Sequence, residues 1–342
     1  VFNTPRDKFI WDVSHQVYVH KLLTGRKHRF DSIRSTGGLS GFAVRAESEH
    51  DCYGAAHAGT ALSAALGICA GRDQRGSDEH VVAIFGDGAL TNGISFEALN
   101  NIAPTTKRFI GILNDNEWGI AKNVGAIANY LHRLITHPSY NKLARDFERF
   151  VRRLPKGEIA MKLAHKAEEG FKGAIADVAL QPSPSGGEMD GRGGYGSSLI
   201  FEEMGVRYLG PIDGHNLPLL INTLEFAKAY DRPVVIHALT QKGKGYAAAL
   251  KNPEKFHGLG PYDVATGATP PAPPDAPPNW QDVFGQALVR LCQKDNSIVG
   301  ITAAMPSGTG LKYLEQAMPN RYYDVGIAEE HGVFVIYAGL VG

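Results

Sequence analysis

Short β-rich runs of apolar residues alternate along the chain with longer segments of helical character. Five runs that are continuous in Val, Ile and Phe predict buried strands, at residues 9–13, 81–85, 109–113, 234–239 and 297–302. Helices are predicted between them, at residues 55–70, 95–102, 217–229 and 280–293. Strands that alternate with helices favour a parallel sheet sandwiched by helices, which binds ligands at the carboxyl ends of its strands. We therefore predict an α/β fold.

Two segments break this pattern and divide the chain. Residues 182–198 hold six glycines and predict a flexible surface loop, whereas residues 270–278 hold six prolines and predict an extended, semi-rigid connector. We place a first domain at residues 1–250, a proline-rich linker at 251–279 and the start of a second α/β domain at 280–342. Because the chain begins at Val1 and stops inside the apolar run 332–341, we expect a fragment of a longer protein.

Composition excludes several classes of protein. Apolar residues make up 43% and charged residues 20% of the chain, as in ordinary soluble globular proteins. The 35 Lys and Arg residues balance 35 Asp and Glu residues, so charge favours neither nucleic acid nor an anionic membrane as a partner. No apolar run reaches the length of a membrane span. Three cysteines without a CxxC spacing argue against a disulfide scaffold or a structural zinc site and favour a reducing compartment.

Polar motifs follow two of the predicted strands. Gly86-Asp87-Gly88-Ala89 comes directly after residues 81–85, and Asn114-Asp115-Asn116 comes directly after residues 109–113. One carboxylate and one amide oxygen at the ends of neighbouring strands suit Mg²⁺, which takes few protein ligands and completes its shell with phosphate oxygens and water. The glycines let the backbone approach a diphosphate, and the helix start near residues 91–93 aims amide groups at it. Either motif alone is as often a simple turn or polar loop, but together they favour a metal–diphosphate site.

This pair of motifs resembles the diphosphate-binding motif of thiamin-diphosphate enzymes. Further segments are similar to the 1-deoxy-D-xylulose-5-phosphate synthase family: Trp11–Gln16, Tyr18, His20-Lys21, Gly37–Leu39, Glu47–Glu49, Gly210–His215, Lys242–Tyr246 and Asp324–His331. The resemblance covers nearly the whole chain apart from the glycine-rich and proline-rich segments. It implies a transketolase-like, thiamin-diphosphate-binding α/β fold, in which residues 1–250 bind the diphosphate and residues 280–342 begin the pyrimidine-binding domain.

The resemblance also implies an activity. It points to thiamin diphosphate and Mg²⁺ as cofactors, and to a transferase that condenses pyruvate with D-glyceraldehyde 3-phosphate to 1-deoxy-D-xylulose 5-phosphate and CO2, for isoprenoid, thiamin and pyridoxal synthesis. A homodimer in a bacterial-type cytoplasm is expected, with a plastid location left open, and neither nucleic acid nor membrane as a partner. Two alternatives stay open: a ketol transferase of the transketolase type, and a catalytically silent fragment that binds the cofactor.

Carried over residue by residue, the resemblance implies a set of site residues. Mg²⁺ would be bound by Asp87, Asn116 and the backbone carbonyl of Trp118. The cofactor would contact His15, Ala56, His57, Ala58, Gly88, Ala89, Asn116, Tyr246 and Glu329. The expected catalytic residues are His15, His257 and Glu329. Most histidines outside these sets are expected to be ordinary surface or hydrogen-bonded residues, and His20, His28 and His132 are expected to be structural.

Glu329 has a role that chemistry supports. A glutamate hydrogen-bonded to the aminopyrimidine ring favours the imino tautomer, which removes the weakly acidic thiazolium C2 proton. A carboxylate partly buried against an apolar ring has a raised pKa and can share that proton. The alternative for Glu329 is an exposed acid at a helix start, where it favours the helix dipole; the surrounding Asp324–Glu329 string favours the catalytic interpretation.

The chain departs from the family pattern beside several of these residues. Ser14 stands where the family has glycine, and Ala56 and Ala58 stand where it has glycine and serine. The added atoms at Ser14 and Ala56 are expected to crowd the cofactor, and Ala58 lacks a hydroxyl. Glu330 replaces a glutamine and adds a charge beside Glu329. For the 342-residue chain alone we expect weak Mg²⁺-dependent cofactor binding, no measurable product, and self-association through apolar residues 333–337.

Overall fold

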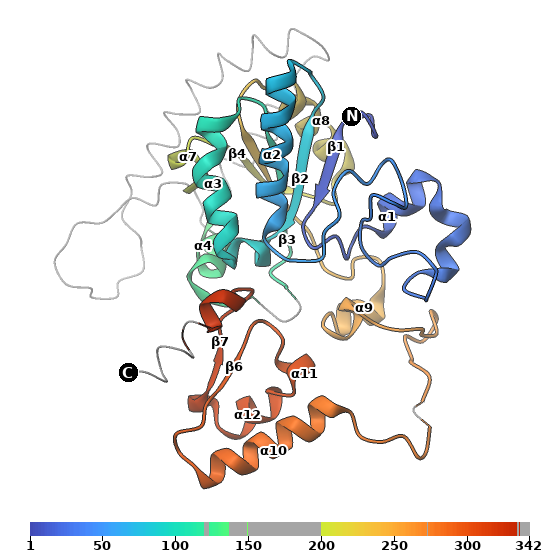
Figure 1. The fold of residues 1–342 in the computed structure, drawn as a ribbon, viewed down its shortest axis with the longest axis vertical. Helices are drawn as coiled ribbons and strands as arrows, with labels where there is room; N and C mark the ends of the chain where they lie inside the picture. Colours follow the sequence, from blue (N-terminus) through green and yellow to red (C-terminus); the bar gives the residue numbers. More distant parts are fainter. Residues whose placement is uncertain (120–122, 137–148, 150–199, 272, 334, 336–342) are drawn as a thin grey trace, which may run out of the picture. The chain divides into compact units, whose positions relative to one another are not determined.

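The computed structural model describes residues 1–119, 123–136, 149, 200–271, 273–333 and 335, so the predicted loop at 182–198 lies outside the described residues. The chain forms two compact units (Figure 1). The first consists of Val1–Gly86, Ile94–Asp115 and His132–Leu239, and the second of Asp87–Gly93, Asn116–Leu131 and Thr240–Gly342. Each of the three segments of the second unit begins directly after a strand of the first, which ends at Gly86, Asp115 or Leu239.

The first unit is built on a five-stranded parallel sheet with the order β1-β2-β3-β5-β4. Its strands are β1 (Lys8–Trp11), β2 (Val81–Gly86), β3 (Ile110–Asp115), β4 (Arg207–Asp213) and β5 (Val234–Leu239). Four of them coincide with predicted strands. β4 was not predicted because Gly210-Pro211 resembles a turn signal. It is one of the two edge strands, where proline is tolerated, and its register shifts between Leu209 and Ile212.

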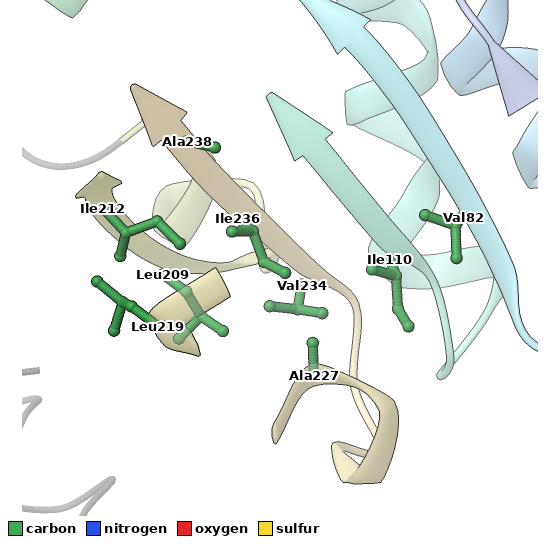
Figure 2. Packing of buried hydrophobic residues seen from close by; sticks show 9 residues of the cluster. All are labelled: Val82, Ile110, Leu209, Ile212, Leu219, Ala227, Val234, Ile236 and Ala238. Atoms are coloured by element: carbon green, nitrogen blue, oxygen red, sulfur yellow. The ribbon is translucent and has the colours of Figure 1, made fainter. Parts of the chain in front are cut away.

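Helices cover both faces of this sheet, as predicted. In Figure 1, α2 (Thr60–Arg75) and α3 (Gly93–Thr105) pass in front of the strands and α8 (Leu217–Ala229) lies behind them. Shorter helices of the first unit are α1 (Tyr18–Lys21) and α7 (Ile200–Glu203). The α8 face is apolar: side chains of β2 to β5 pack with Leu219 and Ala227 of α8 (Figure 2). Burial of these side chains, at roughly 25 cal/mol per Å² of apolar surface, holds the helix on the sheet.

Helix α2 begins five residues later than predicted, and the cause is a remote carboxylate. Gly59 has a positive φ of 80°, so it turns the chain into the helix. The backbone amides of Gly59 and Ala61 donate to Asp12 Oδ1 and Oδ2, at 3.0 and 3.1 Å. Asp12 lies just after β1, so this carboxylate satisfies amides at the helix start that a local capping side chain would otherwise bind. Burial raises the pKa of Asp12, against the lowering effect of these two amides.

Ion pairs are buried in residues 20–51 of the first unit. Arg26 donates to both carboxylate oxygens of Asp51, at 2.6 and 2.9 Å, and His20 Nε2 lies 3.1 Å from the same carboxylate. Lys21 donates to Glu47 at 2.5 Å. Burial by itself would raise the pKa of Asp51, but hydrogen bonds from His20, Arg26 and a backbone amide bring it well below its ordinary value. His20 therefore has a structural partner here.

We expect Asp51→Asn to destabilise the protein by about 3–5 kcal/mol, because it removes the buried carboxylate that accepts two hydrogen bonds from Arg26 and leaves the guanidinium with the more distant Glu47, at 3.6 Å, as its charge partner. The pKa of Asp51 is lower in the folded protein than in the unfolded chain. The Asp51 carboxylate therefore contributes to the free energy of unfolding above the ordinary aspartate pKa of ~3.9, and this contribution is lost as the pH falls below it. Urea unfolding at neutral and acidic pH measures both effects. The matched control is Asp78→Asn in the exposed Arg6–Asp78 pair, which should leave the unfolding midpoint close to that of the parent. Equal stability of the Asp51 variant and the parent would contradict this account.

The second unit contains the predicted helix at 280–293, observed as α10 (Trp280–Lys294). A parallel pair of short strands, β6 (Gly300–Thr302) and β7 (Tyr322–Asp324), accompanies it. Other α-helices among its described residues include α4 (Gly125–Thr136, which ends in the first unit), α9 (Ala247–Lys251), α11 (Pro306–Thr309) and α12 (Lys312–Ala317). The described part of the proline-rich stretch 270–278 contains neither helix nor strand, as a connector would. No helix among the described residues is long and apolar enough to cross a membrane.

Candidate functional site

The Asp87 turn follows β2 directly. Residues Asp87–Thr91 form a short 3-10 turn, and the Asp87 side chain is only 4% exposed. Asn123 Nδ2 donates to Asp87 Oδ2 at 2.8 Å, which orients the carboxylate. A Cβ at Gly88 would stand 3.1 Å from Ile327 Cδ1 and 3.3 Å from Asn123 Oδ1, so a side chain here would have to displace these neighbours by a few tenths of an ångström. The turn therefore presents an oriented, buried carboxylate on a tight backbone.

The Asn116 loop follows β3, the neighbour of β2 in the sheet. Strand β2 pairs with β3 up to Gly86 and Asn114, so the chain leaves both strands at the same level. Asn116 Oδ1 accepts the Trp118 backbone amide at 3.0 Å, and Glu117 has a positive φ of 63°. The Glu117 carbonyl accepts the backbone amide of Asn123 at 3.2 Å. Asn123, whose side chain donates to Asp87, is therefore also bonded to the loop that contains Asn116. Asp87 and Asn116 thus belong to one unit and share Asn123 as a link.

A lysine that the motif analysis did not assign to the site lies in the same unit. Lys242 Nζ donates to the Gly119 carbonyl at 2.6 Å and lies 2.9 Å from His257 Nδ1. Its ammonium is also 5.8 Å from the centre of the Trp118 ring, a cation–π distance. Burial lowers the pKa of Lys242, and the carboxylates of Asp87 and Glu254 oppose that shift. His257 is therefore tied, through Lys242, to the loop that follows Asn116.

The segment before Glu329 is tied to the Asp87 turn. The Thr91 hydroxyl donates to the Gly88 carbonyl at 2.7 Å and accepts the Ile327 backbone amide at 3.2 Å. Glu329 follows two residues later, at the start of helical residues 329–333, and both Glu329 and Glu330 are exposed. The structure thus places the Asp87 turn and the approach to Glu329 in one unit, although they are more than 230 residues apart in the chain.

Tyr246 belongs to a small aromatic cluster. Its ring lies against Phe256 and Tyr262, with ring centroids 5.5 and 6.0 Å away, and its hydroxyl donates to the Val264 carbonyl at 2.9 Å. A Cβ at the buried Gly267 would come within 3.3 Å of that hydroxyl. Tyr246 therefore has a packing role in the second unit, four residues after Lys242 in the chain.

The remaining predicted residues lie in the first unit. His15 follows Val13 and Ser14, which both have positive φ, 52° and 66°, a strained conformation for a β-branched residue. Ser14 is buried, and its hydroxyl accepts the Ala43 amide at 2.9 Å, so the serine that departs from the family pattern has a defined partner. Ala56 and His57 are exposed and Ala58 is half-buried, just before the Gly59 turn into α2.

The parallel sheet, whose neighbouring strands lead into an aspartate turn and an asparagine loop, fits a transketolase-like α/β fold of the thiamin-diphosphate-binding class. Residues 1–182 and 189–240 match the family model described as 1-deoxy-D-xylulose-5-phosphate synthase, and residues 276–340 match the model described as transketolase, pyrimidine binding domain. The chain belongs to the 1-deoxy-D-xylulose-5-phosphate synthase family.

Three sequence relatives agree with this assignment. Proteins named 1-deoxy-D-xylulose-5-phosphate synthase from Methylacidiphilum infernorum and Acidobacterium capsulatum are each 52% identical over 340 residues, which cover 99% of this chain and 50% of theirs. The protein of that name from Desulforudis audaxviator is 47% identical, with the same coverage. The chain thus spans about half the length of these relatives. Among solved structures, a transketolase mutant from Pichia stipitis is 14% identical with a TM-score of 0.43, covering 97% of this chain and 54% of that one.

Proposed function

We propose that this chain is the cofactor-binding part of an enzyme that condenses pyruvate with D-glyceraldehyde 3-phosphate to 1-deoxy-D-xylulose 5-phosphate and CO2. The observation that carries the proposal is the 52% identity to proteins of that name over 99% of the chain. A product of this kind serves isoprenoid, thiamin and pyridoxal synthesis.

Family membership also leads us to propose a homodimer. Helix α10 exposes Trp280, Phe284 and Leu291, which a subunit interface would cover.

The donor set supports Mg²⁺ together with a diphosphate. Asp87 would supply a carboxylate oxygen, Asn116 an amide oxygen and Trp118 its backbone carbonyl, all hard oxygen ligands. Gly88 and Ala89 would meet the diphosphate, because the closely packed Gly88 backbone has no side chain in the way.

Other residues would act on the remainder of the cofactor and on the substrates. From the family resemblance we assign His15, Ala56, His57, Ala58 and Tyr246 to cofactor binding. Glu329 would hold the aminopyrimidine, and His15 and His257 would bind and orient the reacting groups. When bound, thiamin diphosphate supplies the electron sink for decarboxylation; the chain supplies binding, orientation and proton transfer.

The experiment uses the full-length gene product with thiamin diphosphate and Mg²⁺. We expect C2-labelled pyruvate and D-glyceraldehyde 3-phosphate to give labelled deoxyxylulose phosphate, with one CO2 released for each product. Omitting pyruvate and offering a ketose phosphate with an aldose phosphate tests the transketolase alternative. Ketol transfer between sugar phosphates, without turnover of pyruvate, would overturn the proposal. Cofactor binding without either reaction would indicate a catalytically silent protein and would also overturn it.

A further inference from the structure

Lys242 is held at a turn that leaves its ammonium little freedom. Lys244 donates its amide to the Gln241 carbonyl and Tyr246 to the Gly243 carbonyl, at 3.1 and 3.0 Å. Gly243 has a positive φ of 78°, and a Cβ there would come within 2.9 Å of Ala249, so the turn packs closely against α9. The side chain of Lys242 leaves this rigid turn and ends between two acceptors, the Gly119 carbonyl and His257 Nδ1.

We propose that Lys242 is a positioning residue that fixes the tautomer and the orientation of His257. An ammonium group has three donors and no acceptor, whereas each nitrogen of a neutral imidazole is either a donor or an acceptor. At 2.9 Å from Lys242 Nζ, His257 Nδ1 must therefore accept, and the ring proton must be on Nε2. The bond to Gly119, at 2.6 Å, anchors the ammonium at the same time.

The consequence for chemistry rests on the proposed function. With Nδ1 accepting from Lys242, the His257 ring carries its proton on Nε2, and Lys242 fixes the ring relative to Gly119. A histidine without this partner would divide its population between two tautomers, and only one of them has the proton on Nε2. In this role Lys242 acts through His257 and contacts no reacting atom. The role therefore differs from that of a lysine whose ammonium binds the diphosphate.

The first test measures the tautomer and needs neither substrate nor cofactor. Nitrogen NMR of histidine-labelled protein is recorded at about pH 8, above the ordinary histidine pKa of ~6.5, and the His257 signals are identified by their loss in His257→Gln. We expect a pyridine-like Nδ1 and a pyrrole-like Nε2 in the parent and in Lys242→Arg, which keeps a charged donor. In Lys242→Met the Nδ1 signal should move toward the pyrrole-like position as the second tautomer becomes populated. A protonated Nδ1 in the parent, or an unchanged spectrum in Lys242→Met, would overturn the proposal.

The second test asks whether Lys242 acts through His257. In the full-length protein, Lys242→Met should lower kcat by about 10- to 100-fold, the range found when a residue that orients a functional histidine is removed. In the His257→Gln background the same change should cost less than about twofold, because the interaction is already absent. Equal losses in both backgrounds would mean that Lys242 acts independently. If the protein makes no deoxyxylulose phosphate at all, the proposed function fails while the NMR result still decides the role of Lys242.

Discussion

Replacing Asp87 by alanine is expected to abolish Mg²⁺-dependent binding of thiamin diphosphate. Asp87 is the only charged side chain in the proposed ligand set, it is 4% exposed, and Asn123 orients it. Without its carboxylate the ion would be bound by neutral oxygens only, and the diphosphate would lose its bridge to the protein. We expect the affinity measured by titration calorimetry to fall at least ~100-fold, equivalent to about 2.7 kcal/mol.

Two further variants make this result specific. Asn116→Ala should weaken binding less than Asp87→Ala, because it removes a neutral ligand rather than a charge. Glu117→Gln removes an exposed negative charge from the same loop and keeps the backbone, so it should leave the affinity within about twofold of the parent. An Asp87→Ala variant that binds the cofactor with the parent's affinity in Mg²⁺ would refute the ligand assignment.

The second large effect is expected at Glu329. In the full-length protein, Glu329→Ala should slow exchange of the thiazolium C2 proton of the bound cofactor by at least ~100-fold, since it removes the carboxylate that favours the imino tautomer. Rapid-quench hydrogen–deuterium exchange followed by proton NMR measures this rate.

Glu330→Gln is the matched control, because the two exposed acids are adjacent at the same helix start and this change restores the residue usual in the family. It should leave the exchange rate unchanged or raise it. Equal losses from the two substitutions would show that the wrong carboxylate has been assigned.

The sheet could be predicted largely from the sequence, because buried parallel strands are nearly continuous in Val, Ile and Phe. The same rule predicted that Asp87 and Asn116 follow neighbouring strands, which the β2–β3 register confirms. β4 escaped prediction because Gly210-Pro211 is acceptable only at an edge, and edge position is a property of the folded sheet. The start of α2 was misplaced because its amides bind Asp12, 47 residues earlier, and no local pattern reveals a partner at that separation.

The candidate site was predictable only in part, for a similar reason. Strand ends and family motifs indicated Asp87, Asn116 and Glu329, and the structure places all three in the second unit. The links between them depend on contacts between distant segments: Asn123 with Asp87, and Thr91 with Ile327. Lys242 lies in the Lys242–Tyr246 motif, but the motif gave it no role, because its partners Gly119 and His257 are known only from the fold. The domain bounds at 250 and 279 and the roles of the site residues stay predictions.

The most direct measurement of the central claim is a crystal structure of the protein with thiamin diphosphate and Mn²⁺ in place of Mg²⁺, read by anomalous scattering. We predict one Mn²⁺ peak bound by the Asp87 carboxylate, the Asn116 amide oxygen and the Trp118 carbonyl, with the diphosphate against the Gly88 backbone. A Mn²⁺ peak and diphosphate density elsewhere in the protein, or ordered cofactor with no metal at Asp87, would contradict the account.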